Sequence, residues 1–366
     1  MRIMNKADQP AQDMKEDPED RARGPYDPGI ETADDLWFLP NIDDDEAEPD
    51  ILLPGPRADQ RPLFDAAEWL AAQDRLSGPL ADLAVAFGAL DERLRAGPEG
   101  WRHRLALMEV ADLGWWTGER IGAERLALWI GARIGATGED AQALARAGWA
   151  VRRLSGGPGP GDGGWERGLG VFLGRVEHDG PGPAETVSDL AEIMDGAGGL
   201  HPVTAAAVLF YAWRMLGEGP AQDIEAAAMA ARYGARMARP GQGGALFLPL
   251  ALTGPGGLHA TGAMPERLSR WIAGARQATL AALLHLDRIR DWQAGALAAT
   301  RDLSGRTPAR LIEALSAWPM LSAPMAEELT GASRAAVQRN LDTLSARGLV
   351  REVTGQGRYR VWGASV

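Results

Sequence analysis

Two side chains with paired hydrogen-bonding groups lie next to each other near the C-terminus, at Gln338 and Arg339. Glutamine can bind an adenine edge, and arginine a guanine edge, through two hydrogen bonds in the major groove of DNA. Both belong to the stretch SRAAVQRNLDTLSARG, in which Val337, Leu341 and Leu344 recur at steps of four and three. We therefore predict a helix, about 333–347, that buries these apolar side chains and offers its polar residues to duplex DNA.

The start of this predicted helix suits contact with phosphates. Ser333 is a favourable N-cap, and the N–H groups of a first helical turn attract anions. Arg334 lies beside it and Ala335 follows, both away from the predicted core face. We expect Ser333 and Arg334 to contact phosphates. The predicted DNA-contacting residues of this helix are Ser333, Arg334, Ala335, Gln338 and Arg339.

A hairpin follows the helix in the stretch EVTGQGRYRVWG, residues 352–363. Two glycines allow its turn to close, and apolar residues flank the turn on both sides. We expect Arg358 at the tip, with Gln356, to reach the adjacent minor groove or phosphates. Arg351 and Arg360 lie on the predicted strands, from which they are expected to reach the DNA backbone.

Two further helices precede the predicted recognition helix. Thr307 and Pro308 begin the first, with the threonine as N-cap and the proline at the first helical position. Ser322 caps the second, which ends at Gly331. Three helices followed by two strands predict a winged helix-turn-helix domain over residues 304–366. Because such domains also serve as protein docking modules, the pattern does not by itself establish DNA binding.

The remainder of the sequence is mostly helical by pattern, so the predicted fold class is mostly α, with a multi-helix body and the C-terminal winged domain. A long helical pattern runs from Pro265 to about Leu303. The helix that it predicts is expected to pack either against the body or against a second copy of the protein. The predicted segments are an acidic, largely disordered tail over 1–60, a helical domain over 61–154, a Gly/Pro-rich connector over 155–182, and a second helical region over 183–303.

Charge is unevenly distributed along the 366 residues, whose formal net charge is -12. Residues 1–75 hold 20 acidic and 8 basic side chains, whereas residues 301–366 hold 6 acidic and 9 basic ones. A modest basic excess therefore falls on the predicted winged domain. Within the tail, residues 34–50 set a Leu-Trp-Phe-Leu island among acids, which docks either on the protein's own body or on a protein partner.

Cysteine is absent, which excludes disulfides and thiolate metal sites. No apolar run is long enough to span a membrane, and the N-terminus lacks the apolar stretch of a signal peptide. We therefore expect no membrane partner and a cytoplasmic location, with association to the nucleoid when DNA is bound.

Catalytic motifs are missing from the sequence. The five histidines lack metal-ligand spacing, and no nucleophile elbow or phosphate-binding loop ending in Lys-Ser/Thr occurs. Asp91 and Glu92 are adjacent and are expected to be solvated or paired with Arg93 and Arg95. We predict no catalytic residue, no metal, no cofactor and no enzymatic activity.

The C-terminal stretch SAPMAEELTGASRAAVQRNLDTLSARGLVREVTGQGRYRVWGA resembles the DNA-binding domain of an uncharacterised family of replicon-borne bacterial proteins. The stretches LDERLRAG, RLALMEVADLGWWTGERI and ALARAGWAVRRL are similar to that family's N-terminal helical domain of unknown function. The resemblance covers residues 63–363 and implies DNA binding. A similar winged domain closes many Fic proteins, whose catalytic motif is absent from this sequence.

Together these features predict a transcriptional regulator that reads duplex DNA, and its modest basic charge favours a homodimer on a pseudo-palindromic site. Two alternative hypotheses stay open. In the first, the protein is an adaptor that uses the winged domain for docking. In the second, it is a small-molecule sensor whose helical body forms a pocket. Five tryptophans would line that pocket or belong to the core: Trp101, Trp115, Trp116, Trp129 and Trp149.

Overall fold

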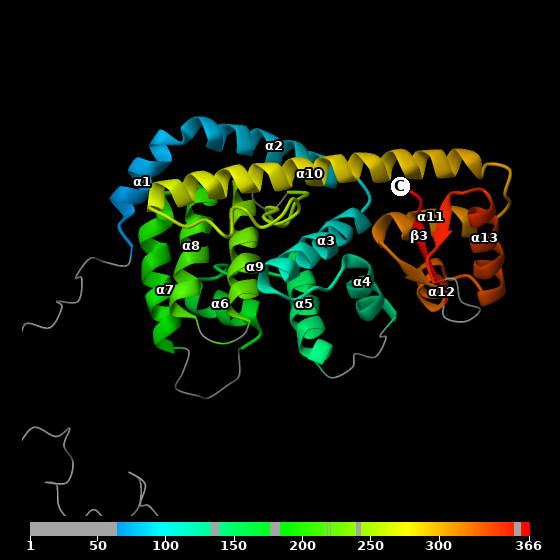
Figure 1. Ribbon diagram of the computed structural model, residues 1–366, viewed down its shortest axis with the longest axis horizontal. Helices are drawn as coiled ribbons and strands as arrows, with labels where there is room; N and C mark the ends of the chain where they lie inside the picture. The colour runs from blue at the N-terminus through cyan, green and yellow to red at the C-terminus, as the bar shows by residue number, and fades with distance from the viewer. Residues whose placement is uncertain are drawn as a thin grey trace, which may run out of the picture. The chain divides into compact units, whose positions relative to one another are not determined.

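The computed structural model describes most of the residues that follow the acidic tail (Figure 1). The described residues are 64–132, 139–175, 184–217, 219, 221–238, 243–354 and 360–366. The predicted tail over 1–60, with its partner segment 34–50, lies outside them. None of the helices in the described ranges is both long and apolar enough to cross a membrane.

Ten helices and two short 3-10 turns build the body, the part of the described structure that precedes residue 300. The first helices carry strong local signals, such as Asp65, whose carboxylate accepts hydrogen bonds from the N–H groups of Ala67 and Glu68. The helices are α1 (Ala66–Arg75), α2 (Ser77–Ala96), α3 (Gly100–Thr117), α4 (Ala123–Ala132), α5 (Glu139–Ser155), α6 (Trp165–Leu173), α7 (Ala184–Gly196), α8 (Pro202–Leu216), α9 (Gln222–Gly234) and α10 (Met264–Ala299).

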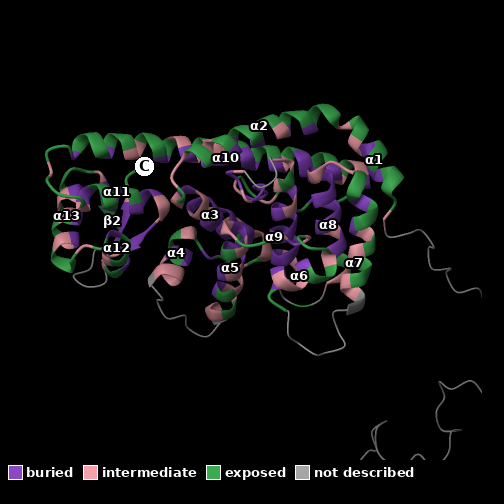
Figure 2. Ribbon diagram, turned by 180° about the vertical axis from the view of Figure 1, so that it is seen from behind, coloured by how far each residue is buried: buried purple, intermediate pink, exposed green. Residues whose placement is uncertain are grey.

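Helices α8 and α9 form the most deeply buried part of the body (Figure 2). Runs of alanine, at 205–207 and 226–228, are fully or almost fully buried on these helices. Their small side chains let two helical backbones approach closely while excluding water. His201 begins α8 as its N-cap, where Nδ1 accepts a hydrogen bond from the N–H of Val203 at 3.2 Å.

The long helix α10 joins the two apolar cores of the described structure. Its first two-thirds, which includes Trp271 and Ile289, packs in the body core alongside α2. Farther along, Ala296 is buried in a second core made by the C-terminal domain. The apolar pattern of α10 also includes Leu280 and Leu284, yet these are 42% and 53% exposed, because that side of α10 has no helix packed on it within the described residues.

The C-terminal domain confirms the predicted fold class. Its elements are α11 (Thr307–Ala317), β1 (Leu321–Ser322), α12 (Ala323–Thr330), α13 (Arg334–Ala346), β2 (Val350–Glu352) and β3 (Val361–Ala364). The strands form an antiparallel sheet in the order β1-β3-β2. The predicted two-stranded hairpin is therefore extended by β1, a two-residue strand too short to leave a period in the sequence. Thr307 is the first helical residue rather than the N-cap, which is Arg306.

Two other expectations need correction. The predicted connector over 155–182 contains α6, whose Leu169 and Phe172 are completely buried. Asp91 is neither solvated nor paired with an arginine: it is 8% exposed and accepts a hydrogen bond from the N–H of Ala245 at 2.8 Å. Glu92 does pair with Arg95, as expected.

Candidate nucleic-acid interface

Helix α13 is positioned by short-range signals that the sequence displays. Gly331 ends α12 at φ 64°, a left-handed conformation that glycine adopts without strain. Two residues later the Ser333 hydroxyl accepts a hydrogen bond from the N–H of Ala336 at 3.4 Å, which caps α13. Val337, Leu341 and Leu344 are at most 1% exposed and fix the inward face. The opposite face of α13 is thereby held toward solvent.

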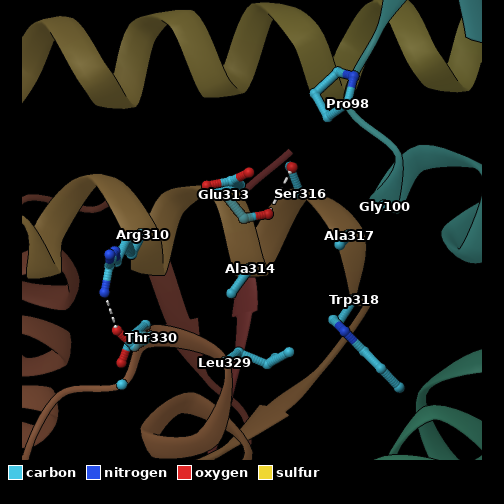
Figure 3. A pocket seen from close by; sticks show the side chains of 11 residues that line it. Pro98, Gly100, Arg310, Glu313, Ala314, Ser316, Ala317, Trp318, Leu329 and Thr330 are labelled. Atoms are coloured by element: carbon cyan, nitrogen blue, oxygen red, sulfur yellow. Dashed lines mark hydrogen bonds between the residues drawn. The ribbon is translucent and has the colours of Figure 1, made fainter. Parts of the chain in front are cut away.

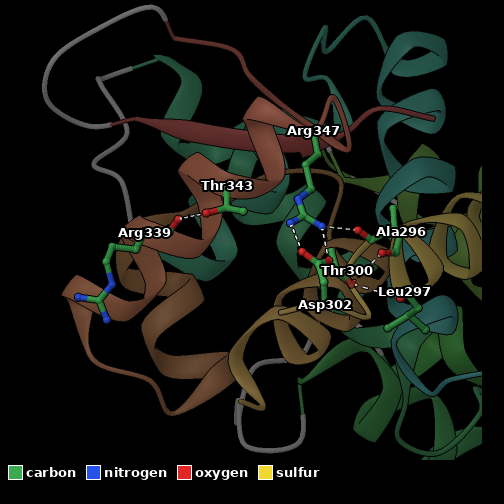
Figure 4. A network of polar contacts seen from close by, with 8 residues as sticks. Ala296, Leu297, Thr300, Asp302, Arg339, Thr343 and Arg347 are labelled. Atoms are coloured by element: carbon green, nitrogen blue, oxygen red, sulfur yellow. Dashed lines mark hydrogen bonds and ion pairs between the residues drawn. The ribbon is translucent and has the colours of Figure 1, made fainter. Parts of the chain in front are cut away.

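Arg339 lies on this outward face together with Ala335, and both are exposed. The guanidinium of Arg339 has no hydrogen bond or ion pair among the described residues; only its backbone carbonyl is engaged, by the Thr343 hydroxyl at 2.8 Å. Figure 4 shows its side chain directed away from the domain. An exposed, unpaired guanidinium has its donors available for a ligand such as a guanine edge or a phosphate.

Gln338 is less available than the sequence suggests. Its amide nitrogen donates a hydrogen bond to Asp342 Oδ1 at 3.0 Å, one turn farther along α13. A contact of this kind, four residues apart on one helix face, stabilises the helix slightly. Gln338 is half-buried rather than exposed. The bond to Asp342 uses one of the two N–H donors of its amide and so restricts how the side chain can turn toward a base.

Arg360 is the predicted contact residue most firmly engaged within the protein. Its Nε donates to Glu352 Oε2 at 2.9 Å, and its Nη1 lies 3.2 Å from Asp342 Oδ1. The guanidinium also covers the ring of Trp362, with 5.0 Å to the ring centroid. Because Arg360 directly precedes β3, these contacts link the start of that strand to β2 and to α13.

The remaining predicted contact residues differ in exposure and in ion pairing. Arg334 is exposed at the first turn of α13, and its side chain lies 3.7 Å from Glu327. Arg351 is exposed on β2 and makes no ion pair with another described residue. Gln356 and Arg358, predicted at the tip of the hairpin, lie outside the described residues. Helix α13 and its N-cap thus bring together five predicted contact residues: Ser333, Arg334, Ala335, Gln338 and Arg339. Arg351 lies on β2, and Arg360 directly precedes β3.

The opposite end of α13 carries an ion pair that sequence reasoning missed. Arg347 donates two hydrogen bonds to the carboxylate of Asp302, at 2.7 and 2.6 Å, and another to the carbonyl of Ala299 (Figure 4). The hydrogen bond from Arg347 lowers the pKa of Asp302. The pair ties α13 to the end of α10, and no local pattern predicts it because 45 residues separate the partners.

A buried arginine of the body holds the first helix of the domain. Arg104 on α3 is 7% exposed and donates to the carbonyls of Leu315 and Ser316, at 3.2 and 3.5 Å, where α11 ends. Its Nε donates to His285 Nε2 on α10 at 2.9 Å. Burial lowers the pKa of His285 to about 4, with the nearby charge of Arg104 acting in the same direction. A neutral His285 can therefore accept this bond at neutral pH.

A hollow of about 460 Å³ lies where the body meets the helix-turn-helix (Figure 3). Pro98 and Gly100 of the body line one side, and Arg310, Leu329 and other residues of α11 and α12 line the other. Arg310 is occupied in part, since it donates to the carbonyl of Thr330 at 2.7 Å. Of the five tryptophans considered as pocket residues, none lines this hollow: Trp101 is buried, Trp115 is 58% exposed, and Trp116, Trp129 and Trp149 are half-buried around the body core.

Metal chemistry has no visible support in the part of the protein that the structure describes: no three acidic or histidine side chains there lie close enough together to hold an ion.

Comparison with known protein families places residues 309–364 in the family of helix-turn-helix DNA-binding domains. The matched residues run from α11 to β3 and contain all of α13. The body lies outside the match, so its resemblance to a helical domain of bacterial replicon-borne proteins stays a prediction. No curated protein is similar enough in sequence to count as a match.

Proposed function

We propose that the protein is a transcriptional regulator that binds duplex DNA through α13 and the adjacent sheet. The observation that carries the proposal is the exposed guanidinium of Arg339 at the centre of the outward face of α13, which pairs with no other residue that the structure describes. This helix belongs to a segment that matches a family of helix-turn-helix DNA-binding domains. A solvent-exposed face that is rigidly backed by a core and carries unpaired donors suits a polyanionic ligand.

In this proposal α13 enters the major groove with its N-terminal half. Ser333 and Arg334 contact phosphates beside the first turn, where N–H groups and the helix dipole favour anions. Arg339 binds a guanine edge and Gln338 an adenine edge. Arg351 contacts the backbone from β2, and Gln356 and Arg358 contact the minor groove or phosphates. No chemical step on DNA is proposed.

The modest charge of the domain favours two copies on one site. Residues 301–366 hold 9 arginines against 6 acids, and several of these arginines are engaged with acids of their own domain. Two symmetry-related domains double the number of phosphate contacts, and a two-fold dimer predicts a pseudo-palindromic operator. The alternative in which the protein is an adaptor predicts no pseudo-palindromic operator.

The test is fluorescence anisotropy with the intact protein and duplexes selected from a random library, titrated over a range of salt concentrations. If five or six phosphates are neutralised per dimer, the log-log slope of affinity against salt should be roughly -5. Arg339→Ala should lower affinity for the selected site by about 1–3 kcal/mol and relax base preference at one position.

A matched control is Arg301→Ala, which removes an exposed arginine from the loop after α10. It should leave base preference unchanged. Equal losses for both variants would show that only net charge matters at Arg339. A folded wild-type protein that binds no duplex even at low salt would overturn the proposal and favour the docking-module alternative.

A further inference from the structure

Four polar side chains form a continuous series of contacts from the sheet to the outward face of α13: Glu352, Arg360, Asp342 and Gln338. Arg360 bridges Glu352 at 2.9 Å and Asp342 at 3.2 Å, and Gln338 donates to the same oxygen of Asp342 at 3.0 Å. Asp342 therefore engages Gln338, which the proposed function assigns to an adenine edge, and Arg360, which the sequence predicts to reach the DNA backbone.

Asp342 stands in an unusual place for a carboxylate. It lies on α13 one turn beyond Gln338 and three residues beyond Arg339, on the face that would meet a polyanion, and its side chain is 52% exposed. An oxygen of a carboxylate accepts hydrogen bonds from a guanidinium much as a phosphate oxygen does. Asp342 thus takes up a donor of Arg360 that could otherwise bind a phosphate.

We propose that Asp342 is a specificity-determining residue that suppresses binding to non-cognate DNA; the inference rests on the proposed function. It does so in two ways. Its carboxylate holds Arg360 and Gln338 within the protein, and its charge repels phosphates that approach α13 out of register. A site that places a cytosine amino group at Asp342 satisfies the carboxylate, because that amino group is a donor in the major groove.

Among the described residues, the charged groups near Asp342 include Arg360, which directly precedes β3, Glu352 on β2 and Arg339 on α13. The neutral Gln338 flanks Asp342 on the same helix. Arg360 is further restrained by Trp362, which is 1% exposed and therefore fixed. Releasing Arg360 from Asp342 thus frees one end of a guanidinium whose other contacts stay in place.

The experiment compares Asp342→Ala and Asp342→Asn with the wild-type protein on a mixed-sequence duplex, by anisotropy over a range of salt concentrations. Asp342→Ala should tighten binding to this duplex by about five- to tenfold at low salt, and should steepen the log-log slope by about 1. Asp342→Asn removes the charge but keeps an acceptor oxygen, so its gain should be smaller. A loss of preference for the selected site should accompany both.

Asp302→Ala is the matched control, because it also frees an arginine of α13 from an acidic partner, but at the opposite end of the helix. Its affinity for mixed-sequence DNA should stay within about twofold of the wild-type value. Gains of equal size for Asp302→Ala and Asp342→Ala would show that any freed charge suffices and would overturn the inference.

The double variant Asp342→Ala/Arg360→Ala separates the two ways in which Asp342 acts. The inference predicts that most of the gain disappears when Arg360 is absent. If the double variant keeps the whole gain in affinity, Asp342 does not act by holding Arg360. If Asp342→Ala and Asp342→Asn both bind mixed-sequence DNA as the wild type does, or more weakly, the inference as a whole is overturned. If wild-type protein binds no duplex at all, the failure is that of the proposed function instead.

Discussion

Arg104 of the body and Arg339 of α13 carry the same guanidinium in opposite surroundings. Arg104 is 7% exposed and directs its donors to two carbonyls and one imidazole nitrogen. Arg339 is exposed and directs its donors to no other described residue. Because a buried cation without partners is strongly destabilising, Arg104 must be satisfied within the fold. Arg339 faces no such requirement, so its donors are available to a ligand.

The same contrast separates the polar groups of the two regions more broadly. In the body, Asp91 and Glu109 are buried and accept hydrogen bonds from backbone N–H groups of the loop over 243–251. Arg232 is 9% exposed and donates to carbonyls near the end of α5. The body therefore uses buried ionisable side chains to hold loops and helix ends. The C-terminal domain keeps its charged side chains at the surface, as at Arg339 and Arg351.

The largest effect should come from Arg104→Ala. The substitution removes the donors that satisfy the end of α11 and leaves a cavity between α3, α10 and α11, so we expect a loss of about 3 kcal/mol in the free energy of unfolding. Urea denaturation measures this loss. Arg120→Ala, at an exposed position after α3, is the control and should stay within about 0.5 kcal/mol. Similar small losses for both would mean that Arg104 does not support the domain.

A pH-dependent effect should follow from Glu109. Burial raises its pKa to about 8, although backbone hydrogen bonds from Leu250 and Ala251 oppose the shift. The folded state therefore keeps a proton that the unfolded state releases near its ordinary pKa of 4.5. Stability contributed by this group is present at low pH and is lost as pH rises toward 8, by about 2 kcal/mol between pH 6 and pH 8.

Glu109→Gln tests this origin, because the amide oxygen can still accept from both N–H groups. Denaturation at several pH values should give a flatter stability profile for the variant, with its advantage over the wild type increasing above pH 7. Parallel profiles for the two proteins would assign the pH dependence to other groups.

A third test concerns the contact between the body and the first helix of the domain. A Cβ atom added to Gly100 would overlap the Cβ of Ala317 at the end of α11, whereas one added to Gly88 in α2 meets nothing within 4 Å. Gly100→Ala should therefore cost about 1.5 kcal/mol by overpacking, while Gly88→Ala should stabilise by up to about 1 kcal/mol. Stabilisation by both would show that the body and α11 separate easily.

Local signals were sufficient to predict the core of the candidate interface. Ser322, Gly331 and Ser333 act within three or four residues of their own positions, so their capping roles follow from the sequence and are confirmed. The inward face of α13 follows equally from the spacing of its apolar residues. The match of residues 309–364 to a DNA-binding domain family agrees with that part of the prediction.

Contacts between distant segments were not predictable, because no local period records them. Arg347 meets Asp302 across 45 residues, and Arg104 meets Leu315 across 211. The sequence predicts Arg360 on a strand and in contact with the DNA backbone. In the structure it lies directly before β3, and its pairing with Asp342 follows from the packing of this segment beside α13. The exposure of Leu280 and Leu284 has the same origin, since periodicity marks apolar residues without showing which neighbour covers them.

The smallest expected effect concerns Arg351, which is exposed on β2 and unpaired within the described residues. If it contacts a phosphate, Arg351→Ala should reduce the magnitude of the log-log salt slope by about 1 per copy and weaken all duplexes alike, whatever their sequence. The free energy of unfolding of this variant should change by less than about 0.5 kcal/mol, because no contact is lost.

Arg347→Ala should show the opposite combination of effects on stability and on the salt slope, since the Arg347 guanidinium is bound to Asp302 and to the carbonyl of Ala299. It should lower stability slightly and leave the salt slope unchanged. If Arg351→Ala instead lowers stability and leaves the slope alone, then Arg351 belongs with the supporting arginines, and the surface proposed for DNA ends at α13.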